Sequence, residues 1–166
     1  MFGDPADRDE VNAFVAMLWR RGTLYEAEVM ASSGLVALDL SHAQGDEKEQ
    51  LTLEALQRGE PLIYNGRIRA GDLLGVPDLL RRVGAGYIPI DIKSGRGKEG
   101  GGDPDEDGDD GKLKPHYAVQ IALYVDILEQ RGLAAGRRGI ILDVHRREHV
   151  YDLAATRGPR ISETIW

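Results

Sequence analysis

The chain has 166 residues, 42% of them hydrophobic, and a formal net charge of -7. This length suits one globular domain with its own core, so we expect a single domain over residues 1–166. The absence of cysteine excludes disulfides, thiolate zinc sites and iron–sulfur clusters, so any metal must bind oxygen or imidazole ligands. No apolar run is long enough to span a membrane and no signal peptide is present, so we expect a cytoplasmic protein without a membrane partner.

The first part of the chain is predicted to be mainly helical. Apolar side chains recur at helical spacing up to Ala31, and Gly22 interrupts the pattern. A second helical pattern ends before a Gly-Glu-Pro sequence, and a short strand is expected between the two. The helices are predicted over residues 7–20, 23–32 and 46–57, and the strand over residues 36–40.

Four strands are predicted next, because the apolar pattern changes to an alternation of period two. Turn-forming residues separate these strands, namely Asn65-Gly66, Gly75-Val76-Pro77 and Gly84-Ala85-Gly86. Short turns of this kind favour antiparallel pairing of successive strands. The strands are expected over residues 62–64, 68–74, 78–83 and 87–93.

The last two of these strands are predicted to bring polar side chains together. In the final strand, isoleucines alternate with Asp91 and Lys93, so we expect the isoleucines to enter the core and both polar groups to share the opposite face. A two-residue turn at Gly84-Ala85 sets Asp78 opposite Asp91. Two such carboxylates repel each other unless a cation neutralises them, and Mg²⁺ or Mn²⁺ suits oxygen ligands. The alternative is a hairpin face whose acids are merely solvated.

Residues 94–115 are rich in Gly, Asp and Lys and contain hardly any apolar side chain, which predicts a mobile acidic loop. Seven acids and no base lie between residues 99 and 110, so the remainder of the chain has no net charge. A neutral body is compatible with a nucleic-acid partner. The acids from Asp103 onward have the spacing that opens a calcium-binding loop, but Lys114 stands where that loop needs Glu, so we expect a solvated loop.

The last third of the chain combines one helix with two strands. The helix is expected over residues 117–130, and the strands over residues 140–144 and 150–153 form a hairpin across Arg146-Arg147. The complete order of helices, mixed strands, helix and strands predicts an α/β fold built around a mostly central sheet.

The polar residues of these elements carry a resemblance to a known family. A Gly-x-Pro-Asp sequence ending at Asp78, followed by Asp91-x-Lys93, resembles the motif of the PD-(D/E)XK nuclease superfamily. Gln120 and Tyr124, on one face of the following helix, resemble the Gln-x-x-x-Tyr motif of its RecB-like branch. The resemblance implies a restriction-endonuclease-like core, in which a central mixed β-sheet is flanked by helices.

The same resemblance implies a set of functional residues. Glu26 stands where an upstream helix of this branch usually carries a metal-binding His, and a carboxylate is also a competent ligand for Mg²⁺ or Mn²⁺. Lys93 would orient the attacking water or help to deprotonate it, and Gln120 and Tyr124 would position the substrate or support the metal-bound strand. The implied metal ligands are Glu26, Asp78, Asp91 and the backbone carbonyl of Ile92.

The resemblance also implies a function. Members of this branch commonly act as DNA exonucleases or process DNA ends, so we expect a metal-dependent deoxyribonuclease of repair, recombination or defence. The sequence does not distinguish DNA from RNA. A helicase-type or ribonuclease-H-like domain is an expected partner, in the same chain or in another, and the chain itself can be a piece of a longer protein. The alternative is a catalytically inactive nucleic-acid-binding or assembly module with the same fold.

Overall fold

The computed structural model divides the chain into two compact units, Met1–Leu35 and Val36–Trp166, which are described separately here. In the first unit residues 24–32 are helical, which confirms most of the predicted helix over residues 23–32. The predicted helix over residues 7–20 lies outside the described part of the chain. No helix among the described residues is long and apolar enough to cross a membrane. The structure describes residues 24–32, 34–93, 98–99, 112–113, 115–143 and 145–154.

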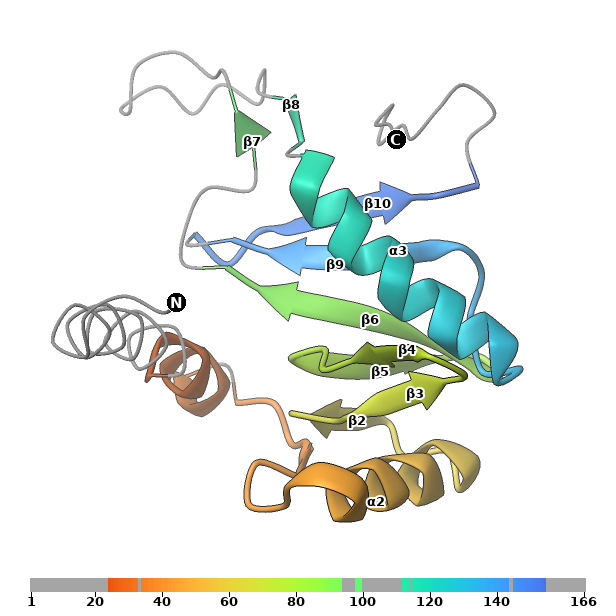
Figure 1. Cartoon of the computed structure of the whole chain (residues 1–166). Coiled ribbons are helices and arrows are strands. Elements are labelled where there is room, and N and C mark those ends of the chain that lie inside the picture. The colour runs from red at the N-terminus through yellow and green to blue at the C-terminus, as the bar shows by residue number, and fades with distance from the viewer. Residues whose placement is uncertain are drawn as a thin grey trace, which may run out of the picture. The chain divides into compact units, whose positions relative to one another are not determined.

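A mixed sheet of six strands forms the centre of the second unit (Figure 1). Its strands are β1 (Leu38–Asp39), β2 (Leu62–Tyr64), β5 (Leu79–Val83), β6 (Gly86–Ile92), β9 (Arg138–Leu142) and β10 (Glu148–Asp152). Their order across the sheet is β1-β2-β5-β6-β9-β10. The β1–β2 and β6–β9 pairs are parallel, and the other neighbours are antiparallel. β6 and β9 are therefore neighbouring interior strands with their carboxyl ends at the same edge of the sheet.

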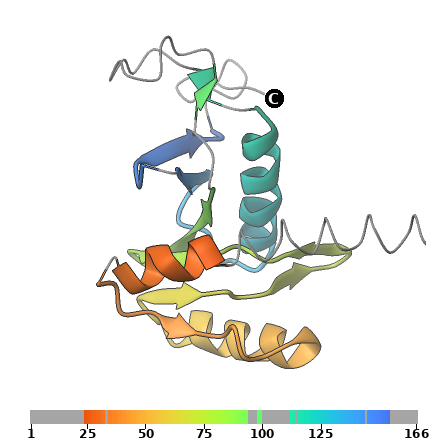
Figure 2. The same ribbon diagram turned by 90° about the vertical axis from the view of Figure 1, so that its left-hand side faces the viewer.

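The described residues of this unit also form two helices and two further pairs of short strands. The helices are α2 (Gly45–Gln57) and α3 (Pro115–Gln130), and α3 lies along one side of the strands (Figure 2). β3 (Ile68–Ala70) pairs with β4 (Leu73–Gly75), and β7 (Lys98–Glu99) pairs with β8 (Lys112–Leu113). The predicted α/β fold with a central mixed sheet and packed helices is confirmed.

The main hydrophobic core lies between one face of the sheet and the two helices. Ile63, Leu80 and Ile141 contribute from three different strands, and Leu56 of α2 and Ile121 of α3 pack in the same cluster. Strand residues enter this cluster with a period of two, as expected for a sheet covered on that face. α3 buries residues on most of its circumference because it contacts both the sheet and the β3–β4 hairpin.

Strand β6 is buried along its whole length. This corrects the prediction that its isoleucine face meets the core and that Asp91 and Lys93 lie on the opposite side. The isoleucines of β6 are buried as expected, but they are not members of the core cluster, whereas Tyr87 is. Tyr87, Asp91 and Lys93 share one face by alternation, so Asp91 lies on the side of the main core. A central strand buried on both faces does not reveal by its polarity pattern which face meets the core.

The predicted strand over residues 68–74 is wrong, because the chain turns at Gly71-Asp72 and forms the separate β3–β4 hairpin. Gly71 has a φ of +56°, a conformation that glycine adopts without strain. As a consequence β5 pairs with β2, so the four predicted strands are not successive neighbours. The β5–β6 hairpin itself is confirmed, and Val83 pairs with Gly86 as predicted.

The remaining predictions for this unit hold with small shifts in the bounds of the elements. The helix over residues 46–57 and the strand over residues 62–64 are confirmed by α2 and β2. α3 starts at Pro115, a residue favoured in the first turn of a helix. Of the predicted loop over residues 94–115, the structure describes the β7–β8 pair and the start of α3, and the acidic run from Gly100 onward lies outside the described residues.

Candidate active site

The carboxyl end of β6 carries an ion pair between a buried aspartate and a partly exposed lysine. Asp91 is only 2% exposed, and its Oδ2 lies 2.6 Å from the Nζ of Lys93. Both side chains are on the same face because they are two residues apart in a strand. Lys93 continues the sheet, since its N–H donates a hydrogen bond of 2.8 Å to the carbonyl of Leu142. The backbone of the ion pair is therefore held by β6 and its parallel neighbour β9.

Asp78 is fixed beside the same end of β6. It directly precedes β5, and the pairing of Leu79 with Ile90 places it in register with Asp91, as the sequence predicts. Its Oδ2 accepts a hydrogen bond of 2.6 Å from the backbone N–H of Ile92, and its carbonyl accepts one of 2.8 Å from Asn65. The carboxylate of Asp78 is thereby tied to the strand that carries Asp91.

α3 adds a chain of polar contacts to the ion pair. Lys93 Nζ donates to Gln120 Oε1 at 3.0 Å, and Gln120 Nε2 donates to the Tyr124 hydroxyl at 2.9 Å. The hydroxyl in turn donates to the carbonyl of Val76 at 3.4 Å. The Nζ of Lys93 also lies 5.4 Å from the ring centre of Tyr117. The tertiary structure thus brings four of the predicted site residues, Asp91, Lys93, Gln120 and Tyr124, into one network.

Close packing fixes the tyrosine of this network. A Cβ atom at Gly75 would lie 2.6 Å from the Tyr124 ring, which is too close for any side chain. Gly75 ends β4, three residues before Asp78, and Tyr124 is only 5% exposed. The glycine of the predicted Gly-x-Pro-Asp sequence therefore allows the hairpin to approach α3 and holds the Tyr124 hydroxyl near Val76.

The donor atoms at this site suit a hard divalent cation. Asp91 Oδ2 is buried and makes no hydrogen bond of acceptable geometry with any described residue, in spite of its closeness to Lys93. A buried carboxylate oxygen in this state can accept a metal ion. The described residues nevertheless contain no group of three or more His, Cys, Asp or Glu side chains that could hold one. The backbone carbonyl of Ile92 remains a predicted ligand.

Glu26, the remaining predicted ligand, belongs to the first unit. It lies on the helix over residues 24–32 and is partly buried. Because Glu26 belongs to a compact unit separate from that of Asp78 and Asp91, its role as a metal ligand stays a prediction.

A second buried aspartate, which the sequence analysis did not single out, follows β9. Asp143 is 2% exposed, and its Oδ1 accepts backbone hydrogen bonds from His145 at 2.8 Å and Arg147 at 3.0 Å. Its Oδ2 lies 2.8 Å from His149 Nε2. Burial raises the pKa of Asp143, but the hydrogen bonds from His149 and the two backbone N–H groups outweigh it and hold the pKa below its usual value.

Asp143 lies opposite Lys93 in the parallel pair of β6 and β9. Since Ile92 pairs with Leu142, Asp143 is the next residue along β9 and lies in register with Lys93 on the neighbouring strand. In the sequence, the position of Asp143 directly after an apolar strand is the signal that could have identified it. Its bonds to the β9–β10 connection show that Asp143 closes this turn.

The amino-acid sequence was also compared with models of known protein families. The chain matches no model of a known protein family. The resemblance to the PD-(D/E)XK superfamily therefore depends on the motif residues described above, and family membership stays a prediction.

Proposed function

We propose that this protein is a divalent-metal-dependent nuclease that hydrolyses DNA phosphodiester bonds. The observation that carries the proposal is the ion pair between the buried Asp91 and the partly exposed Lys93, whose ammonium group is held from the other side by Gln120. A carboxylate buried for structural reasons alone is expected to have its acceptors filled. Asp91 Oδ2 instead lacks a hydrogen bond among the described residues, as a carboxylate that serves a ligand would.

The residues that would hold the metal are Asp78 and Asp91, with the Ile92 carbonyl and Glu26 as further ligands. When bound, a divalent cation lowers the pKa of a coordinated water molecule and neutralises charge on the reacting phosphate. The hydrogen bond from Ile92 to Asp78 keeps one carboxylate in place, and the β-sheet keeps the other. Asp78 and Asp91 would thus be positioned before metal or substrate binds.

Lys93 would act on the water and the phosphate. Its ammonium group has three donors. Gln120 takes one of them, and Asp91 lies next to another, which leaves a donor for a phosphate oxygen or for the attacking water. In this arrangement Gln120 and Tyr124 are positioning residues, since they orient Lys93 and do not contact the substrate themselves. Exonuclease or end-processing activity, in repair, recombination or defence, is the form of this chemistry that the resemblance favours.

The test is digestion of end-labelled single- and double-stranded DNA with Mg²⁺ or Mn²⁺. We expect metal-dependent cleavage by the wild type and none by Asp91→Asn or Lys93→Ala. A matched control is Asp126→Asn, because Asp126 is an exposed acid of α3 that only pairs with Arg137. It should cleave normally, and the size distribution of products would distinguish exonuclease from endonuclease.

The opposite result would favour the alternative function. If the wild type binds DNA without cleaving it, and if Asp91→Asn changes neither DNA binding nor Mn²⁺ binding, the nuclease proposal is wrong. The chain would then be a nucleic-acid-binding or assembly module that retains the fold. The same assay on RNA would show which nucleic acid the protein prefers.

A further inference from the structure

A pocket of about 260 Å³ lies among α2, β3, the last turns of α3 and the turn that follows α3. Of the residues that line it, none belongs to the candidate active site. Its apolar wall is continuous with the core on both sides of the pocket. This wall consists of Leu53, Leu56, Ile68, Ile127, Leu128 and Leu133.

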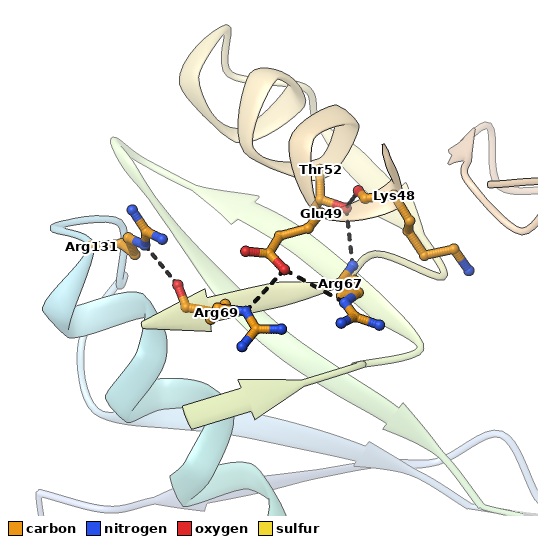
Figure 3. A network of polar contacts seen from close by, with 6 residues as sticks. All are labelled: Lys48, Glu49, Thr52, Arg67, Arg69 and Arg131. Carbon is orange, nitrogen blue, oxygen red and sulfur yellow. Dashed lines mark hydrogen bonds and ion pairs between the residues drawn. The ribbon is translucent and has the colours of Figure 1, made fainter. Parts of the chain in front are cut away.

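Three arginines line the same pocket, and two of them, Arg69 and Arg131, are held by hydrogen bonds from their Nε atoms; Figure 3 shows these contacts. Arg69 Nε donates to Glu49 Oε2 at 3.1 Å, and Arg131 Nε donates to the carbonyl of Arg69 at 2.7 Å. Arg67 Nε is buried 3.5 Å from the same Glu49 oxygen and makes no hydrogen bond within the described structure. The terminal Nη groups of all three arginines form no hydrogen bond with any described residue, so their donors are available to a ligand.

The segment that carries two of these arginines, formed by Arg67 and strand β3 directly after it, is attached to α2. The backbone N–H of Arg67 donates to Thr52 Oγ1 at 3.0 Å, and this hydroxyl donates to the Lys48 carbonyl at 2.7 Å (Figure 3). Thr52 is completely buried. A pocket wall held in this way needs little ordering when a ligand binds.

The charges around the pocket do not balance. Besides the three arginines, only two acids line it, Asp46 and Glu49. Glu49 is shared by Arg67 and Arg69, so one carboxylate faces two guanidinium groups. The excess positive charge favours an anionic ligand, and guanidinium groups bind phosphate oxygens with good geometry.

The apolar wall and the size of the pocket define the rest of the ligand. Leucine side chains next to the arginines favour a ring or another apolar group attached to the anion. The volume of about 260 Å³ is close to the lower end of known ligand pockets, roughly 300 Å³, so a small molecule fits better than a polymer. We infer that the pocket binds a small organic phosphate of the size of a nucleoside monophosphate. This inference does not depend on the proposed nuclease activity.

Calorimetric titration of the full chain with deoxyadenosine monophosphate tests the inference. The titration is done with a chelator present, so that no metal can recruit the nucleotide to the candidate active site. We expect saturable binding, and about tenfold weaker binding to Arg131→Gln and to Arg69→Gln. Deoxyadenosine and inorganic phosphate should each bind about tenfold more weakly than the nucleotide, because each lacks one half of the ligand.

Two control variants separate this pocket from other sites. Arg138→Gln removes an exposed arginine of β9 that does not line the pocket, and Asp91→Asn alters the candidate active site. Both should bind the nucleotide like the wild type, and thermal unfolding checks that Arg131→Gln is folded. The inference is overturned if the nucleotide shows no saturable binding, if folded Arg131→Gln and Arg69→Gln bind it normally, or if inorganic phosphate binds equally well.

Discussion

Asp91 and Asp143 occupy related positions with different surroundings. Both are 2% exposed, and they lie at the carboxyl ends of the parallel neighbours β6 and β9, on the face that meets α3. Asp143 accepts two backbone hydrogen bonds and contacts His149, so its acceptors are filled by its own turn. Asp91 Oδ2 has Lys93 beside it but no hydrogen bond among the described residues. Burial alone therefore does not distinguish the two aspartates, whereas the hydrogen bonding of their carboxylates does.

The largest expected effect is on activity at Asp91. Asp91→Asn should lower the rate of metal-dependent DNA cleavage on the order of 100-fold or more, because a metal ligand and its charge are lost. The free energy of unfolding should change by less than about 1 kcal/mol, since a buried charge without full partners contributes little to stability. Cleavage assays and urea unfolding measure the two effects. Strong destabilisation with normal specific activity would assign Asp91 a structural role.

Asp143 is expected to behave in the opposite way. Asp143→Asn leaves backbone N–H groups of the β9–β10 turn facing a weaker acceptor, and we expect a loss of about 2–3 kcal/mol in the free energy of unfolding. Activity per folded molecule should be retained. Asp152→Asn is the matched control, because Asp152 is an exposed acid that accepts one backbone hydrogen bond from Ala154. If Asp143→Asn abolished cleavage without loss of stability, the two aspartates would not differ as described.

The stabilising effect of Asp143 should depend on pH. Its pKa is lower in the folded protein than the usual 3.8, so it stabilises the fold at pH values above 3.8 and loses this contribution as the pH falls through the lowered pKa. The difference in unfolding free energy between wild type and Asp143→Asn should therefore be largest near neutral pH and shrink in acid. Urea unfolding over a series of pH values measures it, and a constant difference would contradict the prediction.

A substitution at Gly75 is expected to have a smaller effect on both the cleavage rate and the free energy of unfolding. Gly75→Ala introduces a methyl group 2.6 Å from the Tyr124 ring, which must shift and carry its hydroxyl away from Gln120. We expect a loss of about 1–3 kcal/mol in unfolding free energy together with slower cleavage. In the double variant with Tyr124→Leu the added methyl group has more room, so the two stability losses should be less than additive. Strict additivity would show that the contact is unimportant.

The smallest expected effect is that of Tyr124→Phe, which removes one hydroxyl and keeps the ring. Gln120 would lose a hydrogen-bond partner, at a cost of about 0.5–1.5 kcal/mol in unfolding free energy. Cleavage should fall less than in Gln120→Ala, because Gln120 contacts Lys93 directly. A larger loss of activity in Tyr124→Phe than in Gln120→Ala would mean that the hydroxyl contacts substrate itself.

The amino-acid sequence determined the features that depend on neighbouring residues. Periodicity located α2, α3 and most strands, and the Gly84-Ala85 turn predicted the register of the β5–β6 hairpin, including the position of Asp78 relative to Asp91. The spacing of Gln120 and Tyr124 placed them on one side of a helix. Each of these predictions needs only local geometry, which a single segment defines.

Only the tertiary structure decided which segments meet. That Lys93 reaches Gln120 and that Arg69 and Arg131 line one pocket both depend on how α3 packs in the second unit. The sequence analysis missed the β3–β4 turn because the apolar residues on either side of the turn continue the strand pattern. Periodicity reports the face on which a side chain lies within its own element, whereas contacts between distant segments arise from the packing of whole elements.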